Sequence, residues 1–340
     1  MKKSKVFALA GVSLLAATFL AACSGSKESK SASGEDKTYG YVYNDDPITL
    51  DYTVSSKASV HDITTNGVDG LLENDKYGNL VPSIAEDWSV SKDGLTYTYK
   101  IRKGVKWYDA DGEEHGEVTA HDFVTGLQHA ADKKSETLPL VQDSVKGLKD
   151  YVDGKITDFS QVGVKAVDDY TLEYTLNQPE TFWNSKTTNG VLMPVNGEFL
   201  KSKGDDFGQP GDVKSILYNG PFLLKSITSK SEITFEKNEN YWDKDNVHIS
   251  KIKLSYYDGS DQDSLARAFS DGSYTTARLF PASSNFASVE AKYKDNIYNT
   301  QPGSGVAVLG FNIDRQSYNH TSKTSDEQKS STKKAILNKN

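Results

Sequence analysis

The chain has almost no cysteine: Cys23 is the single one among its 340 residues. Without a second thiol an internal disulfide is excluded, so burial of apolar side chains must stabilise the fold. Methionine is scarce too, with two residues against 19 tyrosines. Because tyrosine is rigid and amphipathic whereas methionine is adaptable, this balance favours rigid contact surfaces over a flexible apolar groove.

An excess of basic residues is also missing. The formal net charge is −8, and lysine and arginine form no stripe along the sequence. Binding of nucleic acid needs a basic surface, so no nucleic-acid partner is predicted. The acidic balance suits a soluble extracellular binding protein, and the length predicts a globular chain of two domains.

Motifs for catalysis and cofactor binding are missing as well. The sequence contains no nucleophile elbow, Walker loop, dinucleotide-binding glycine motif or metalloprotease helix. Its histidines are dispersed, and the eight-residue spacing of His121 and His129 is too wide for both to chelate one ion without another partner. Carboxylate pairs such as Asp168-Asp169 fall in predicted turns, although carboxylate number alone leaves a glycosidase open. We therefore predict no catalysis, no cofactor and no metal site.

Long apolar runs are missing except near the start. The run from Val6 to Leu20 is too short for a comfortable membrane span, follows three lysines and leads into Leu20-Ala21-Ala22-Cys23. This ending looks like a bacterial lipobox. We predict a lipoprotein signal peptide at 1–22, a lipid anchor on Cys23 and a disordered, Ser- and Lys-rich tether at 23–38. The alternative is an ordinary secretion signal in which the cysteine occurs by chance and is not lipidated.

The most informative stretch runs from Leu80 to Val124. Residues 95–102 alternate apolar and polar side chains, which predicts a strand with one buried and one wet face. Thr119 is placed to begin a helix as its N-cap, with Asp122 three residues later completing a capping box.

Periodicity also predicts elements elsewhere in the chain. Helical patterns occupy 63–72 and 264–269. Further strands are predicted at 39–43, 162–167, 170–176, 222–227, 232–237, 251–257 and 306–312. Trp88, Trp107 and Trp242 are expected in the core, whereas Trp183 is left open between a core residue and a ligand platform.

Four motifs in this order resemble the signature of the peptide/nickel-binding family (family 5) of ABC-transporter solute receptors. They are Pro82-x-x-Ala85-x-x-Trp88, Asp93-Gly94-x-Thr96-Tyr97, Lys106-Trp107 and Thr119-Ala120-x-Asp122-Phe123. The later Asn219-Gly220-Pro221-Phe222 and Asn238-x-x-Tyr241-Trp242-Asp243 match as well. Departures are Tyr52 in place of a proline and a longer acidic insert at 109–116, expected to alter only a surface hairpin. With the lipobox, the resemblance over 39–315 points to the Ali-type oligopeptide-binding lipoproteins of streptococci.

The resemblance implies a mixed α/β fold of the periplasmic-binding-protein-like type II, with two lobes around a cleft. Residues 39–68 and 196–312 would form a discontinuous first lobe, and 69–195 an inserted subdomain. The second lobe is expected to be missing, because the sequence ends where family members enter it. Residues 313–340 would then be a polar tail at the start of that lobe.

The resemblance also implies a function: capture of oligopeptides at the outer face of the cell membrane for an ABC importer, whose permease and ATPase subunits are the partners. In such relatives an extended peptide is bonded along its main chain, with its side chains in hydrated pockets. The positions that match residues near the ligand are Ser55, Ser56, Lys57, Ala58, Ser59, Leu138, Pro139, Asn189, Asn219 and Gly220. An ordinary loop for Ser55–Ser59 and an ordinary turn for Asn219-Gly220 are the alternatives.

Two other functions stay open. A nickel, haem or sugar receptor of the same family is disfavoured by the dispersed metal ligands. A truncated surface lipoprotein that acts as an adhesin or a sensor is the other alternative.

Overall fold

The computed structural model describes residues 37–281, 283–298 and 326–327. Its contacts divide the chain into two units, 1–284 and 285–340. Within the second unit the described helices are α7 (Phe286–Lys292) and the 3-10 turn η6 (Lys294–Asn296). All elements discussed below belong to the first unit.

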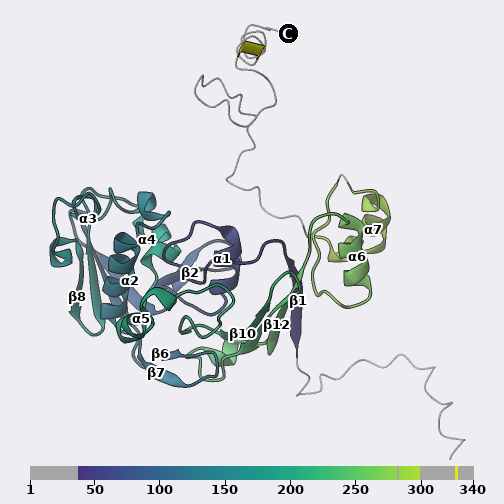
Figure 1. Ribbon diagram of the computed structural model, residues 1–340, viewed down its shortest axis with the longest axis horizontal. Coiled ribbons are helices and arrows are strands. Elements are labelled where there is room, and N and C mark those ends of the chain that lie inside the picture. Colours follow the sequence, from purple (N-terminus) through teal and green to yellow (C-terminus); the bar gives the residue numbers. More distant parts are fainter. Residues whose placement is uncertain (1–36, 282, 299–325, 328–340) are drawn as a thin grey trace, which may run out of the picture. The chain divides into compact units, whose positions relative to one another are not determined.

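One four-stranded sheet joins the beginning of the chain to a segment some two hundred residues later (Figure 1). Its strand order is β1 (Thr38–Tyr43), β12 (Lys251–Tyr256), β11 (Glu232–Lys237) and β10 (Phe222–Thr228). β1 runs parallel to β12, while the other pairs are antiparallel. The strands predicted in these regions are confirmed.

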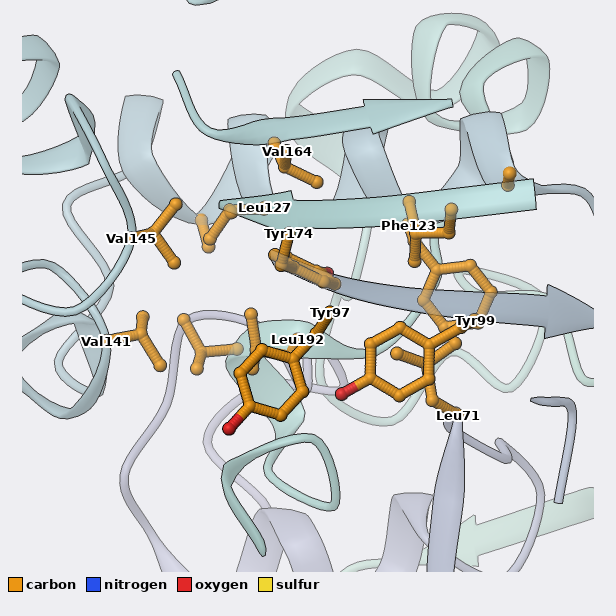
Figure 2. Close-up of a cluster of buried hydrophobic side chains, with 14 of the residues drawn as sticks. Leu71, Tyr97, Tyr99, Phe123, Leu127, Val141, Val145, Val164, Tyr174 and Leu192 are labelled. Atoms are coloured by element: carbon orange, nitrogen blue, oxygen red, sulfur yellow. The ribbon is translucent and has the colours of Figure 1, made fainter. Parts of the chain in front are cut away.

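A second four-stranded sheet contains the strand with the clearest alternation. Its order is β4 (Ala85–Val90), β5 (Thr96–Ile101), β9 (Thr171–Thr175) and β8 (Val164–Asp168). Tyr97 and Tyr99 are buried, whereas Lys100 between Tyr99 and Ile101 is exposed, as predicted. Figure 2 shows Tyr97 and Tyr99 projecting to one side of their strand, among other buried apolar side chains.

The helix α2 (Ala120–Asp132) begins with the predicted capping box. Thr119 N donates a hydrogen bond to Asp122 Oδ2 at 2.8 Å. Trp107 Nε1 donates to the same oxygen at 3.3 Å, and burial raises the pKa of Asp122 to about 6. Phe123 and Leu127 on this helix are fully buried in the cluster of Figure 2. The cap therefore fixes the start of the helix inside a hydrophobic core.

The buried apolar side chains form two clusters. The first cluster takes its members from Leu71–Leu192 together with Leu217. The second takes them from Tyr43–Val68, Tyr108, Ala110 and Met193–Leu254. Trp107 and Trp183 are fully buried in the first cluster, so Trp183 is a core residue. Trp88 and Trp242 are partly buried and pack against the same cluster.

The helix predicted over 63–72 is wrong in position. The observed helix α1 is Ala58–Thr64, and Leu72 already begins the strand β2 (Leu72–Asn74), which pairs with β3 (Leu80–Pro82). Gly67 O accepts hydrogen bonds from the backbone N–H groups of Asn219 and Gly220, so this carbonyl is bonded across the chain and not within a helix. Long-range pairing has overridden the local apolar spacing here. The strand predicted at 306–312 lies outside the described residues.

The remaining elements are short. The acidic insert forms the expected hairpin between β6 (Lys106–Tyr108) and β7 (Glu114–Glu117). Other helices are α3 (Leu148–Val152), α4 (Trp183–Lys186), α5 (Gly197–Lys203) and α6 (Gln262–Ser270). The 3-10 turns are η1 (Leu138–Leu140), η2 (Phe159–Gln161), η3 (Gly190–Leu192), η4 (Gly204–Asp206) and η5 (Lys244–Asn246). Among the helices of the described residues, none has the length and apolar character of a membrane span.

Candidate functional site

The segment Ser55–Ser59 forms a short exposed stretch that leads into α1. Ser55 is buried, whereas Ser56, Lys57 and Ala58 are exposed. Lys57 is the N-cap residue with extended backbone, and Ala58 begins the helix. The predicted loop therefore ends at Lys57, and the last two of its five residues belong to the first turn of α1.

Buried hydrogen bonds hold the chain on the N-terminal side of this stretch. Asp51 Oδ1 accepts hydrogen bonds from Thr53 N at 3.1 Å and from Thr53 Oγ1 at 2.7 Å. Thr53 O in turn accepts a bond from the buried Ser135 Oγ at 2.7 Å. His129 Nε2, on α2, lies 2.7 Å from Asp51 Oδ2. The approach to Ser55 is thus fixed by groups that water does not reach.

Leu138 and Pro139 lie close to this stretch. They belong to η1, and the residues just before η1 are bonded to the segment that precedes Ser55: Glu136 N donates to Val54 O at 2.9 Å. Leu138 is buried, whereas Pro139 is exposed. Of the two predicted residues, Pro139 is therefore the one that is accessible to a ligand.

Asn189, near the C-terminal end of the predicted inserted subdomain 69–195, also lies near the Ser55–Ser59 stretch. Its Oδ1 accepts a bond from Val191 N at 3.2 Å and so caps η3. The next residue, Gly190, packs so tightly that a Cβ there would meet Tyr52 O and lie 2.7 Å from His61 Cε1. His61 Nε2 lies 2.8 Å from Ser55 O. Gly190 therefore packs beside the histidine that lies against Ser55 O, which places Asn189 one residue from that contact.

Asn219 and Gly220 lie beyond the C-terminal end of α1 and are buried. Asn219 Oδ1 accepts a hydrogen bond from Asp69 N at 2.7 Å, so its acceptor is already used by the protein. A Cβ on Gly220 would lie 2.8 Å from the carbonyl carbon of Gly67, which explains a glycine at this position. The structure thus groups Ser55–Ser59, Pro139 and Asn189, and places the Asn219-Gly220 pair apart at the opposite end of α1.

Sequence reasoning missed two polar contacts, one beside this group and one beside Asn219. Glu136 Oε2 accepts hydrogen bonds from both Ser56 N and Ser56 Oγ, and these bonds, the hydroxyl bond foremost, hold the pKa of Glu136 below its usual range. Tyr241 OH donates to the buried Asp69 Oδ2 at 2.7 Å. Burial raises the pKa of Asp69 to about 7. Neither contact has a local signal, because the partners are 80 and 172 residues apart.

Ligands for a metal ion do not gather near these residues. Throughout 37–281 and 283–298, no group of three or more His, Cys, Asp or Glu side chains is arranged to hold an ion. What the group around Ser56 offers instead is exposed backbone and small polar side chains on a fixed support. Such a surface can hydrogen-bond the main chain of an extended ligand.

Similar proteins are known from several bacteria. The oligopeptide-binding protein AmiA of Streptococcus pneumoniae serotype 4 is 66% identical over 339 residues, which are 100% of this chain and 51% of AmiA. The oligopeptide-binding protein SarA of Streptococcus gordonii is 63% identical over 342 residues, 100% of this chain and 52% of SarA. The chain thus spans about half the length of these relatives.

Solved structures confirm the mixed α/β, periplasmic-binding-protein-like fold. Listeria monocytogenes OppA bound to peptide superposes with a TM-score of 0.66 at 29% identity, covering 78% of this chain and 49% of OppA. The peptide-binding pheromone receptor PrgZ gives a TM-score of 0.67 at 26% identity, covering 77% of this chain and 50% of PrgZ.

The resemblance seen in the sequence motifs is also confirmed. Residues 79–327 match the family described as "Bacterial extracellular solute-binding proteins, family 5 Middle". The match includes the strand β5, the capped helix α2 and the predicted positions Leu138, Asn189 and Asn219. This chain therefore belongs to the family 5 bacterial extracellular solute-binding proteins.

Proposed function

We propose that this chain captures oligopeptides outside the cell for an ABC importer, and that it supplies one wall of the peptide site. The observation that carries the proposal is the 66% identity to an oligopeptide-binding protein along the whole of the chain. The permease and ATPase subunits of the importer are the proposed partners. Chemistry belongs to the ATPase, and this chain contributes binding alone.

The group around Ser56 supports a site of this kind. A stretched peptide is bound mainly through its backbone, which needs exposed donors and acceptors on a rigid support. Ser56, Lys57 and Ala58 are exposed, while Thr53 and Ser55 beside them are buried and bonded. We propose that Ser56–Ser59, Pro139 and Asn189 contact the peptide directly, and that the buried Ser55 holds this stretch in place. Leu138, Asn219 and Gly220 act from beneath, as the support of that surface.

The two clusters support the proposed division of the fold. The first cluster is drawn almost wholly from within 69–195, the proposed inserted subdomain. The second joins residues of 39–68 with residues of 196–312, the proposed discontinuous lobe, and adds Tyr108, Ala110, Met193 and Val195 from the inserted subdomain. We propose that these two parts form one side of the peptide cleft.

We further propose that the mature chain is anchored to the outer face of the membrane by lipid on Cys23, with the predicted tether ending before β1, because Thr38 pairs with Lys251 in the sheet. The lipobox motif that ends at Cys23 supports this proposal. Cells grown with a radioactive fatty acid should label the wild-type protein, and the Cys23→Ala variant should lose both the label and the membrane association. A variant that stays bound to the membrane would contradict the anchor.

Peptide binding is tested by calorimetry on the purified chain. The titrant is a synthetic hexapeptide pool randomised at every position, and a matched mixture of free amino acids is the control. Heat of binding with the pool but not with the amino acids supports the proposal. A folded circular dichroism spectrum without binding would overturn it and favour a surface adhesin or sensor.

A further inference from the structure

Glu136 is bonded to the proposed peptide-contact segment through both its backbone and its side chain. Its N–H donates to Val54 O at 2.9 Å. Its Oε2 accepts from Ser56 N at 2.9 Å and from Ser56 Oγ at 2.6 Å. One residue thus holds two positions, Val54 and Ser56, of the segment that leads into α1, across a sequence distance of about 80 residues.

The bonds on either side of Ser56 are independent of the Glu136 carboxylate. Thr53 O is held by Ser135 Oγ, and Ser55 O lies against His61 Nε2. Ser55 Oγ accepts a bond from Lys57 N at 3.1 Å. Removal of the carboxylate would therefore release Ser56 alone, while the segment kept its path on both sides.

The carboxylate contributes more to conformation than to stability. Ser56 and Glu136 are both exposed, so their hydrogen bonds compete with water and add little to the free energy of unfolding. The Glu136 carboxylate, whose pKa the bonds from Ser56 lower further, is ionised at neutral pH, and ionised acceptors form shorter and stronger bonds than neutral ones. Its main effect is to keep one exposed peptide unit in one orientation.

This orientation leaves the carbonyl of Ser56 available to a ligand. The N–H of Ser56 is used by Glu136 and that of Lys57 by Ser55. Within the described part of the chain, no hydrogen bond is made to the carbonyl of Ser56. A backbone N–H of an extended peptide is the group that would pair with such a carbonyl.

We propose that Glu136 is a positioning residue for peptide binding, whose carboxylate fixes Ser56 so that the Ser56 carbonyl accepts a hydrogen bond from the backbone of the peptide. The inference rests on the proposed function and names a determinant of its affinity. A surface that is ordered before binding has less conformational entropy to lose, so the fixed segment binds more tightly than a free one.

The test compares four variants of the full chain by calorimetry with the randomised hexapeptide pool. Glu136→Ala should weaken the apparent affinity about threefold, because exposed bonds can bias Ser56 only by the small free energy that they contribute. Glu136→Gln keeps a neutral acceptor and should restore most of that loss. Ser56→Ala removes only the hydroxyl bond and should weaken binding by less, about 1.5-fold. Glu239→Ala, which removes an exposed carboxylate from the turn after β11, is the matched control and should bind as wild type.

Two further measurements separate positioning from general damage. The thermal midpoint of Glu136→Ala should equal that of the wild type. Hydrogen–deuterium exchange should rise in the fragment that contains Ser56 and stay unchanged in the fragment that contains β5.

The outcomes distinguish the two proposals. If the wild type binds the pool and Glu136→Ala binds it equally well, the positioning role is wrong and the proposed function stands. Unchanged exchange at Ser56 in Glu136→Ala would likewise overturn the positioning role. If the wild type does not bind the pool, the proposed function fails and the role of Glu136 in it fails too.

Discussion

His129 Nε2 and Asp51 Oδ2 lie 2.7 Å apart, and the two side chains are only 7% and 8% exposed. Asp51 is flanked by Leu50 and Tyr52 of the second cluster, while His129 is on α2, whose Leu127 belongs to the first. The pair therefore connects the two hydrophobic clusters through a polar contact.

Removal of the imidazole should destabilise the chain strongly. His129→Ala leaves Asp51 Oδ2 buried without its partner, so the free energy of unfolding should fall by about 3 kcal/mol. Urea denaturation followed by circular dichroism measures the change. The matched control is His121→Ala on the same helix, where the imidazole is 63% exposed and 3.4 Å from the exposed Asp169. The free energy of unfolding of that variant should stay within about 0.5 kcal/mol of wild type. Equal losses in both variants would show that the buried contact contributes no more to stability than the exposed one.

Because of Asp69, the free energy of unfolding should fall as the pH rises, which is opposite to the usual effect of a carboxyl group. Burial raises its pKa in the folded chain from the ordinary 3.8 to about 7, so between these values the folded chain binds more protons than the unfolded chain. The free energy of unfolding due to this group is therefore highest below the ordinary pKa and falls as the pH rises toward 7. Asp69→Asn keeps an acceptor for Tyr241 OH but cannot ionise.

The comparison that isolates Asp69 is the difference between wild type and Asp69→Asn. Relative to wild type, the variant should gain stability in urea as the pH is raised through this window. Asp245→Asn removes an exposed carboxylate from the same turn region and serves as the control. A difference between wild type and Asp69→Asn that is constant with pH would contradict the raised pKa.

A methyl group at Gly190 should disturb the site and lower stability. Its Cβ would meet Tyr52 O and His61 Cε1, and the backbone oxygen cannot move aside cheaply. Gly190→Ala should therefore lower the free energy of unfolding by about 1–3 kcal/mol and lower the thermal midpoint measured by calorimetry. Gly197→Ala is the matched control, because its nearest neighbour, Thr125 Oγ1, would be 3.4 Å away and alanine favours the helix α5. A Gly190→Ala protein as stable as this control would refute the close packing.

The two candidate asparagines should differ in what they do for the fold. Asn219→Ala leaves Asp69 N buried without an acceptor, so it should cost about 1–3 kcal/mol of unfolding free energy. Asn189→Ala removes a capping bond at a partly exposed position and should cost about 1 kcal/mol or less. Urea denaturation of both variants checks the order. The reverse order would argue that Asn219 is free to serve a ligand directly.

Elements set by local signals could be predicted from the sequence. The alternation through Tyr97 and Tyr99 gave the position of β5 and its buried face, and Thr119 with Asp122 gave the start of α2. In each case the determining residues lie within a few positions of one another. The family could be recognised from the sequence for the same reason, because its motifs are short and occur in a fixed order along the chain.

Features made by distant residues could not be predicted. The segment after α1 has apolar residues at helical spacing, yet its backbone is bonded to Asn219 and Gly220. The contacts of Asp51 with His129 and of Ser56 with Glu136 join residues 78 and 80 positions apart. Only the fold decides that these polar side chains meet, so their roles become visible in the structure alone.

The parallel pairing of β1 with β12 has a consequence for the order of folding. β1 has no partner until residues up to Tyr256 have left the ribosome or the secretion channel. Nearly all of the first cluster, by contrast, is complete once Leu192 has emerged. Folding during export should therefore start in the middle of the chain, with the first strand waiting as an unpaired edge until its distant neighbour arrives.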